Sequence, residues 1–212
     1  MTRAYYDIAF TGPVLDMQKK YGSDTSYAKF LTPEAPANDR LGEAETDFIR
    51  DRDGFYQATV SETGWPYVQY RGGPKGFLHA LDDKTLAYAD FRGNRQYLSV
   101  GNLARNDRIA LFFMDYANRR RLKLLGHART VDIEDDPELV RRLHNPGYHA
   151  KPERAVIIEV AGYDWNCPQH ITERFTRLEI EAAFAPLRDK LARIEAENAE
   201  LKRKLGTPPD RA

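Results

Sequence analysis

A dense run of short β-forming segments between Phe55 and Gly126 constrains the fold of this chain more than any other feature. Turn signals separate these segments in pairs, at Glu62-Thr63-Gly64, Asp82-Asp83-Lys84 and Tyr116-Ala117-Asn118. Regular short strands joined by tight turns predict a closed barrel or a sandwich. The chain is therefore expected to be mainly β.

Helices are expected before, within and after the strands. Pro13 and Gly22 bracket the first, since proline favours the first helical turn and glycine ends helices. Leu41, Ala44 and Phe48 recur at helical spacing and predict a second. The predicted helices cover residues 13–21, 40–51, 94–105, 136–143 and 177–206, and the predicted strands cover residues 55–60, 65–71, 76–81, 86–90, 108–114, 121–131 and 155–160.

The charge balance excludes some classes of function. Lys plus Arg and Asp plus Glu both total 32 in 212 residues, so the formal net charge is zero and no global basic field favours nucleic acid or a membrane surface. We find no secretory signal pattern and no run of about 18 apolar residues. Cys167 is the single cysteine, which excludes an internal disulfide. These features predict a cytoplasmic protein with room for one main domain.

The segment 90–107, DFRGNRQYLSVGNLARND, leads from a strand that ends at Asp90 into a helical pattern. Asn94, Arg95 and Gln96 supply donors where the helix is expected to begin, and such donors bind phosphate groups. The surrounding all-β pattern favours a β-barrel holding a phosphorylated cofactor over a dinucleotide-binding Rossmann domain. The alternative is a surface helix capped by Asn94, with Arg95 in solvent.

A second cluster, Tyr70-Arg71-Gly72-Gly73-Pro74-Lys75-Gly76, follows a predicted strand. Its glycines, flanked by cations, permit close backbone approach to a flat or anionic ligand. It is not a P-loop, because no Gly-Lys-Ser/Thr closes it. A plain loop with a bulge is the alternative.

A third cluster begins the strand at 121–131. If Leu122 and Leu124 face the core, Arg121 and Lys123 share the opposite face, where they could meet a phosphate or an electron-rich ring. A solvated outer face explains these cations equally well.

A fourth cluster, Tyr163-Asp164-Trp165-Asn166-Cys167-Pro168-Gln169-His170, follows the last predicted strand. Trp165 could stack on a ring while Asn166 and Gln169 read its polar edge, although a Trp beside a proline turn is more often a packing plug. The five histidines are scattered and one cysteine cannot build a structural zinc site, so no metal is predicted. No catalytic acid, base or nucleophile can be named.

Residues 177–206 differ in kind, because apolar side chains recur there in steps of four and three. Positions a of this heptad are Leu191, Asn198 and Leu205, and positions d are Leu187, Ile194 and Leu201. A lone Asn at a selects parallel two-stranded pairing, since the two amides satisfy each other only in register. The alternative is an amphipathic helix lying on its own barrel. Residues 207–212 are expected to form a frayed tail.

Taken in order, these clusters resemble the pyridoxamine 5'-phosphate oxidase-like flavoproteins, the FMN-binding split-barrel family. The similarity covers about residues 40–175 and rests on GFYQATV, GWPYVQYRGGPKGF, LAYADFRGNRQYLSVGNLARNDRIALFFMD and RLKLLGHARTV. The ending WNCPQHIT is similar to a branch of predicted flavin-nucleotide-binding proteins. The resemblance implies a Greek-key split β-barrel with N-terminal helices over residues 1–176, followed by a short coiled coil over 177–206.

The resemblance also implies a site. Members of the family bind FMN at a dimer interface, and polar and basic side chains of the strand–helix loop hold its phosphate. In this chain those side chains would be Asn94, Arg95 and Gln96, in the loop that opens at Asp90. Gln69-Tyr70-Arg71 would contact the isoalloxazine, largely through backbone groups.

Further contacts are implied by later segments. Arg121 and Lys123 stand where the oxidase has the Gln and the second Arg of an Arg-Gln-Val-Arg run. Trp165 and Gln169 resemble C-terminal contacts supplied by the other subunit. The resemblance thus implies a homodimer that completes the site.

This chain departs from the oxidase pattern in two places. Gly93-Asn94-Arg95 replaces a Ser-Arg-Lys phosphate run and so loses one cation, and the Arg-rich substrate signature is missing after Trp165. We therefore expect an FMN-dependent oxidoreductase of unassigned substrate rather than a vitamin-B6 oxidase. Related split barrels also use the deazaflavin F420 or haem. The alternative function is a non-catalytic flavin-binding sensor, carrier or partner-binding module.

Overall fold

Seven strands form the sheet on which the rest of the barrel unit is built. The computed structural model describes residues 3–165 and 168–206. The strands are β1 (Gly54–Val60), β2 (Pro66–Gly72), β3 (Leu78–Ala80), β4 (Thr85–Phe91), β5 (Arg108–Asp115), β6 (Arg120–Asp132) and β7 (Pro152–Trp165). The helices are α1 (Arg3–Ala9), α2 (Gly12–Tyr21), α3 (Asp24–Ala28), α4 (Glu43–Arg50), α5 (Leu98–Leu103), α6 (Pro137–Leu143) and α7 (Arg177–Lys204). The prediction of a mainly β chain with flanking helices and a long C-terminal helix is confirmed.

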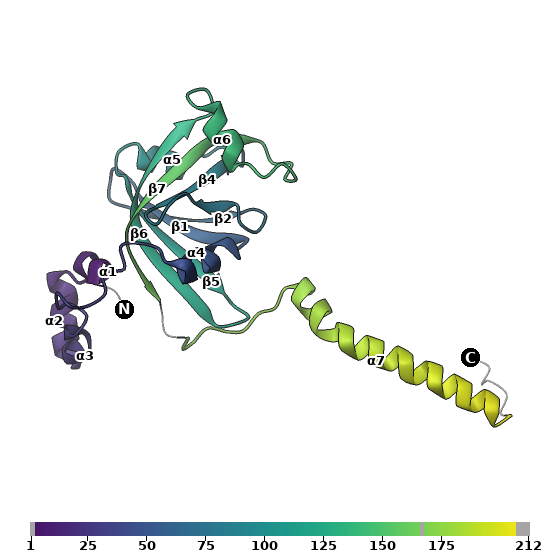
Figure 1. Cartoon of the computed structure of the whole chain (residues 1–212). Coiled ribbons are helices and arrows are strands. Elements are labelled where there is room, and N and C mark those ends of the chain that lie inside the picture. The colour runs from purple at the N-terminus through teal and green to yellow at the C-terminus, as the bar shows by residue number, and fades with distance from the viewer. Residues whose placement is uncertain (1–2, 166–167, 207–212) are drawn as a thin grey trace. The chain divides into compact units, whose positions relative to one another are not determined.

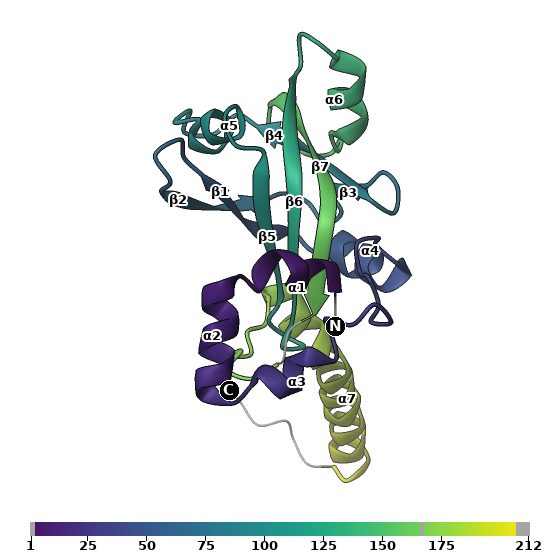
Figure 2. The ribbon, with the colours of Figure 1, turned by 90° about the vertical axis from the view of Figure 1, so that its left-hand side faces the viewer.

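The sheet is antiparallel throughout, in the order β2-β1-β5-β6-β7-β4-β3. The two longest strands, β6 and β7, pair along nearly their whole length and join the two halves of the sheet. Figure 2 shows them running side by side, with α6 beside one end and α1 crossing near the other. Within the described residues the edge strands β2 and β3 do not pair with each other, so the barrel is split rather than closed.

Alternating side chains of the strands fill the interior. Leu122 and Leu124 are fully buried, as the strand alternation predicts, and Phe55 stacks on Phe77 with ring centroids 5.6 Å apart. A smaller apolar cluster, which includes Val140 of α6, lies on the far side of β4 and β7. Burial of large apolar side chains is the main stabilising contribution to such a fold.

Three short helices, α1 to α3, lie together at the N-terminal end of the chain (Figure 1), and aromatic rings from α1, α3 and the residues after them form a cluster. Tyr6 stacks on Phe10 at 4.4 Å and meets Tyr27 edge to face at 5.9 Å. This cluster anchors α1 on β7, where a Cβ atom at Gly162 would lie 2.7 Å from the Tyr5 nitrogen. The sequence predicted only the second of these helices, because α1 and α3 have 7 and 5 residues and too few turns to show periodicity.

Two predicted boundaries are wrong in ways that bear on the site. The helix predicted at 94–105 begins only at Leu98, because Arg95 and Tyr97 adopt positive φ angles of 62° and 54° and keep the chain in a loop. The strand predicted at 155–160 runs from Pro152 to Trp165. Charged residues at both ends of β7 interrupt its apolar run, so the sequence pattern predicted only the central part of the strand.

The chain divides into two units, Met1–Ile171 and Thr172–Ala212, and each is described by itself. The second contains α7, which begins at a capping box in which Thr176 and Glu179 satisfy each other's backbone N–H groups. Gly206, just beyond the helix, has a φ of 68°, as expected for a glycine stop. In the part of the chain that the structure describes, no helix is both long and apolar enough to cross a bilayer.

Candidate functional site

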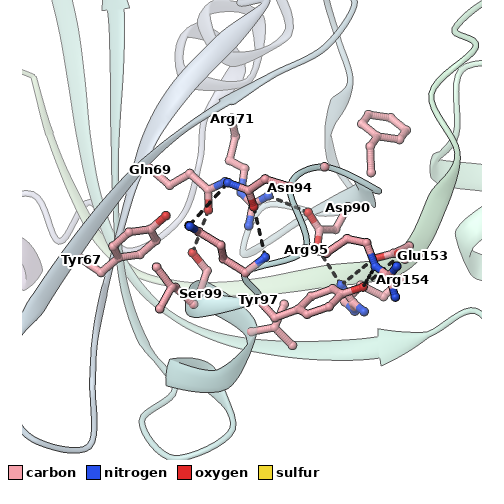
Figure 3. Close-up of a pocket in the computed structure, with 15 residues that line it drawn as sticks. Tyr67, Gln69, Arg71, Asp90, Asn94, Arg95, Tyr97, Ser99, Glu153 and Arg154 are labelled. Atoms are coloured by element: carbon pink, nitrogen blue, oxygen red, sulfur yellow. Dashed lines mark hydrogen bonds and ion pairs between the residues drawn. The ribbon is translucent and has the colours of Figure 1, made fainter.

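A polar pocket of about 160 Å³ lies where β2, the end of β4, the loop before α5 and the start of β7 meet. Figure 3 shows the side chains that converge there. Strand alternation selects the β2 residues: Tyr67, Gln69 and Arg71 line the pocket, while Tyr70 points to the opposite face of the strand and packs against Tyr56. The Ser99 hydroxyl donates to Gln69 Oε1 at 3.2 Å and fixes that amide.

A buried carboxylate between two guanidinium groups forms the floor of the pocket. Asp90 is only 4% exposed, and its Oδ1 accepts from Arg71 Nη1 at 2.7 Å while its Oδ2 accepts from Arg154 Nη1 at 3.1 Å. Arg154 also donates to Asp132 at 3.0 Å. Burial alone would lower the pKa of Arg154, but the hydrogen bonds to Asp132 and Asp90 outweigh it and raise that pKa. Arg154 is therefore held in place and charged, and the same carboxylate holds Arg71 in place.

Arg71 retains unused hydrogen-bonding capacity. Its Nε–H is buried and has no hydrogen-bond partner among the described residues. A buried charged donor without an acceptor is unfavourable, so such a group indicates an anionic or polar ligand. Burial raises the pKa of the neighbouring Tyr88 phenol, so this group stays neutral and donates to Gln57 Oε1 at 2.6 Å.

The loop before α5 forms the open side of the pocket. Gln96 donates its backbone N–H to Asn94 Oδ1 at 3.2 Å, and Arg95 donates its Nε–H to the Tyr97 hydroxyl at 3.3 Å. The same hydroxyl donates to Glu153 at 3.3 Å. Positive φ angles outside glycine persist only where surrounding contacts enforce them. The donors of Asn94, Arg95 and Gln96 thus belong to a structured loop and not, as predicted, to a helix N-terminus.

The pocket brings together six of the predicted site residues, Gln69, Arg71, Asp90, Asn94, Arg95 and Gln96. The other five, Tyr70, Arg121, Lys123, Trp165 and Gln169, do not line it. Lys123 pairs with the buried carboxylate of Asp164 at 2.7 Å and lies over the Tyr5 ring. Gln169 is exposed in the segment that follows β7.

Trp165 is occupied within its own barrel. Its indole N–H donates to Glu45 Oε1 at 2.6 Å, and its ring meets Phe48 edge to face at 4.7 Å. The Arg120 guanidinium lies over the same ring at 4.8 Å. These contacts fit the alternative of a packing plug. Asn166 and Cys167 lie outside the described residues.

Sequence reasoning missed Arg154, Glu153, Ser99 and Tyr67. Arg154 is 64 positions from Asp90 along the chain, so only the β4–β7 register, which pairs the two residues directly, brings them together. The sequence signal for Arg154 was a cation at the start of an otherwise apolar strand. Tyr67 could have been found from its alternation with Gln69 and Arg71.

The opposite face of β2, β1, β5 and β6 is largely apolar. Tyr56, Val68 and Tyr70 are 39%, 60% and 56% exposed there. Arg121 lies over the Phe112 ring at 5.6 Å, and its buried Nε–H has no partner among residues 3–165 and 168–206. We call this surface the outer face; it comprises these five residues with Ala58, Ala110, Met114, Lys123 and Leu125.

Comparison with known proteins identifies the family. The sequence profile of pyridoxamine 5'-phosphate oxidase matches residues 41–161, which is more than half of the chain. The chain belongs to the pyridoxamine 5'-phosphate oxidase family. β2, the loop before α5 and most of β7 all fall inside the matched range.

Several solved structures are similar to this chain at low sequence identity. HupZ from Group A Streptococcus has 18% identity and a TM-score of 0.49, covering 64% of this chain and 99% of its own. A pyridoxamine 5'-phosphate oxidase homologue from Lactobacillus delbrueckii has 20% identity and a TM-score of 0.46, covering 59% and 94%. An FMN-binding protein from Syntrophomonas wolfei has 11% identity and a TM-score of 0.45, covering 72% and 97%. The search of curated proteins found no match.

No group of three or more His, Cys, Asp or Glu side chains in residues 3–165 and 168–206 is placed to hold a metal ion.

Proposed function

We propose that this chain is an FMN-binding oxidoreductase of unassigned substrate that acts as a homodimer, with the FMN phosphate in the pocket beside Arg71. The observation that carries the proposal is the buried Arg71–Asp90–Arg154 group. Two guanidinium groups share one buried carboxylate, and the Arg71 Nε–H remains without an acceptor among the described residues. A phosphate monoester would supply acceptor atoms for that N–H group and a charge-assisted contact to Arg71.

The pocket is too small to enclose a whole cofactor. Sites for small molecules typically measure about 300–1,000 Å³, whereas this one measures about 160 Å³. It suits the phosphate end of the ligand, so the flavin ring would lie outside it against another surface. A second subunit is the natural source of that surface.

The outer face supports the homodimer. Large exposed apolar patches on a protein commonly mark interaction sites, and the exposed rings of Tyr56 and Tyr70 with Val68 form such a patch. Pairing two outer faces about a twofold axis could also bring an acceptor to Arg121, whose buried Nε–H has none among the described residues. A flavin bound at that interface would offer its polar edge.

The bound flavin would supply the hydride or electron transfer. The residues of this chain would bind and orient the flavin. Arg71 and Arg154 would bind its phosphate, and the loop that carries Asn94 and Arg95 would cover it. Arg121 is placed to stabilise negative charge if the dimer brings it to the ring. We assign no catalytic acid or base, and the proposed role of the chain is positioning.

The alternative is a binding protein without turnover, with F420 as a second candidate ligand. The loop carries one cation fewer than the oxidase run that it resembles, and a phosphodiester such as that of F420 has less charge to neutralise than a phosphate monoester. A sensor, carrier or partner-binding role would need the same pocket. These alternatives differ in ligand and in reactivity.

The test is a titration of the purified apoprotein with FMN, riboflavin and F420, followed by NAD(P)H and air. Much tighter binding of FMN than of riboflavin is expected, because riboflavin lacks the phosphate. Equal affinities for FMN and riboflavin would show that the pocket does not bind the FMN phosphate. Bound flavin that bleaches with NAD(P)H and recolours in air would favour the enzyme, and bound flavin that no reductant reaches would favour the carrier.

A further inference from the structure

α7 carries an apolar stripe that the described residues of its own unit, 172–206, leave uncovered. From Ile180 to Leu201 the large apolar side chains are roughly half exposed, between 47% for Ile180 and 59% for Leu187, and no residue of the helix is buried. An isolated helix in water gains little stability from its backbone alone, so an apolar stripe of this length indicates a packing partner.

The stripe follows a heptad over more of the helix than the leucine spacing first indicated. Positions a are Phe184, Leu191, Asn198 and Leu205, and positions d are Ile180, Leu187, Ile194 and Leu201. Spacing of 3.5 residues keeps one narrow seam facing a second helix along its whole length. Pro186 lies inside the helix at position c, away from this seam.

We propose that α7 pairs with α7 of a second copy of this chain as a parallel, in-register, two-stranded coiled coil. Asn198 decides the direction. In this register it faces Asn198 of the partner subunit, and the two amides can donate to and accept from each other. Antiparallel pairing that aligns all a and d layers would place it against Leu187 of the partner subunit, where its polar atoms have no partner.

The flanking charges support the same register. Parallel pairing brings Lys190 at g beside Glu195 of the partner subunit at e, and Glu197 at g beside Lys202 of the partner subunit at e. Each contact joins opposite charges and occurs twice by symmetry. The charge pattern is thus complementary to a second copy of itself.

The shifted antiparallel registers oppose like charges. If Asn198 met Ile194 of the partner subunit, Glu197 would face its own counterpart. If Asn198 met Ile180 of the partner subunit, Lys190 would face its own counterpart. Like charges at these flanking positions disfavour pairing.

Parallel pairing has a consequence for the barrel units. A coiled coil tethers two copies of the first unit and raises their effective concentration for each other. Weak contacts between outer faces would then persist at dilutions where free barrels separate. The inference itself does not depend on which cofactor the barrel binds.

Cysteine cross-linking of the full chain tests the register. In a Cys167→Ser background, Leu191→Cys places the thiol at a, facing its own counterpart, while Ala192→Cys places it at b on the outer side. Under mild oxidation at low protein concentration, the Leu191→Cys chain should form disulfide dimers at least about ten-fold faster, because only position a holds the two thiols within bonding distance. Equal rates at both positions, or no dimer from either because α7 packs on its own barrel, would overturn the proposal.

Charge reversal gives an independent test in the same Leu191→Cys chain. Lys190→Glu and Glu195→Lys should each slow cross-linking, and the double variant should restore it, because these two residues meet only in parallel register. Asp189→Lys, at position f, is the matched control and should leave the rate unchanged. In antiparallel register the double variant would remain slow, and that result would contradict the proposal. Flavin content does not enter either readout.

Discussion

Replacing Arg71 by methionine should separate phosphate recognition from the rest of flavin binding. The Arg71 side chain is 16% exposed, and its Nε–H has no partner among the described residues. A hydrogen bond to a charged group contributes about 1.5–3 kcal/mol. Since about 1.4 kcal/mol is a factor of ten, Arg71→Met should raise the dissociation constant for FMN about 10- to 100-fold.

The same change should leave the barrel folded. Asp90 keeps its contact with Arg154 at 3.1 Å, so its charge stays compensated and the loss should be smaller than the roughly 3–5 kcal/mol for stranding a buried charge. Arg71→Lys keeps a cation and should recover part of the FMN affinity. Thermal unfolding of each variant checks that the fold persists.

The assay is flavin fluorescence quenching, with FMN and riboflavin titrated in parallel. Arg71→Met should weaken FMN binding and leave riboflavin binding nearly unchanged, so the ratio of the two dissociation constants falls toward one. Arg105→Met, an exposed arginine outside the pocket, is the matched control. A folded Arg71→Met protein with the wild-type ratio of FMN to riboflavin dissociation constants would show that Arg71 does not bind the phosphate.

The combined variant Asn94→Ala with Arg95→Ala should lower FMN retention during gel filtration, because it removes the loop donors while keeping the buried cations. Unchanged retention would show that the loop does not bind FMN. Val68→Glu should raise the dimer dissociation constant in sedimentation experiments at least about ten-fold, since it places a charge in the outer face. The control Thr63→Glu, on the hairpin turn, should leave this constant unchanged. Equal effects of the two variants would argue against the outer face as the interface. Burial, with repulsion from a nearby carboxylate, raises the pKa of Tyr163 to about 12. Because the unfolded phenol ionises near pH 10, this residue stabilises the fold fully below about pH 10 and loses its contribution as the pH rises from about 10 to about 12. Tyr163→Phe should therefore flatten the loss of unfolding free energy in that window, and an unchanged slope would contradict the assignment.

The sheet was predictable because its local signals agree. Turn residues separate the strands, and alternation correctly buried Leu122 and Leu124. The length of β7 could not be predicted, because Arg154 and Asp164 at its two ends look like loop residues until their partners across the sheet are known. Long-range pairing, rather than local propensity, extends that strand.

The candidate site was half predictable for the same reason. Arg71 and Arg95 stand out beside glycine-rich turns, so local composition found them. Arg154 enters the pocket only through the β4–β7 register. The helix prediction for residues 94–97 was wrong, because Arg95 and Tyr97 adopt positive φ angles, which the local sequence does not favour.

A flavin whose phosphate is bound in this barrel should be visible in the absorbance spectrum of the purified protein. Bands near 370 and 450 nm, roughly as for oxidised flavin, are expected, and mass spectrometry of the heat-released ligand should identify FMN. A colourless protein that also fails to take up added FMN would show that this barrel is not a flavin site.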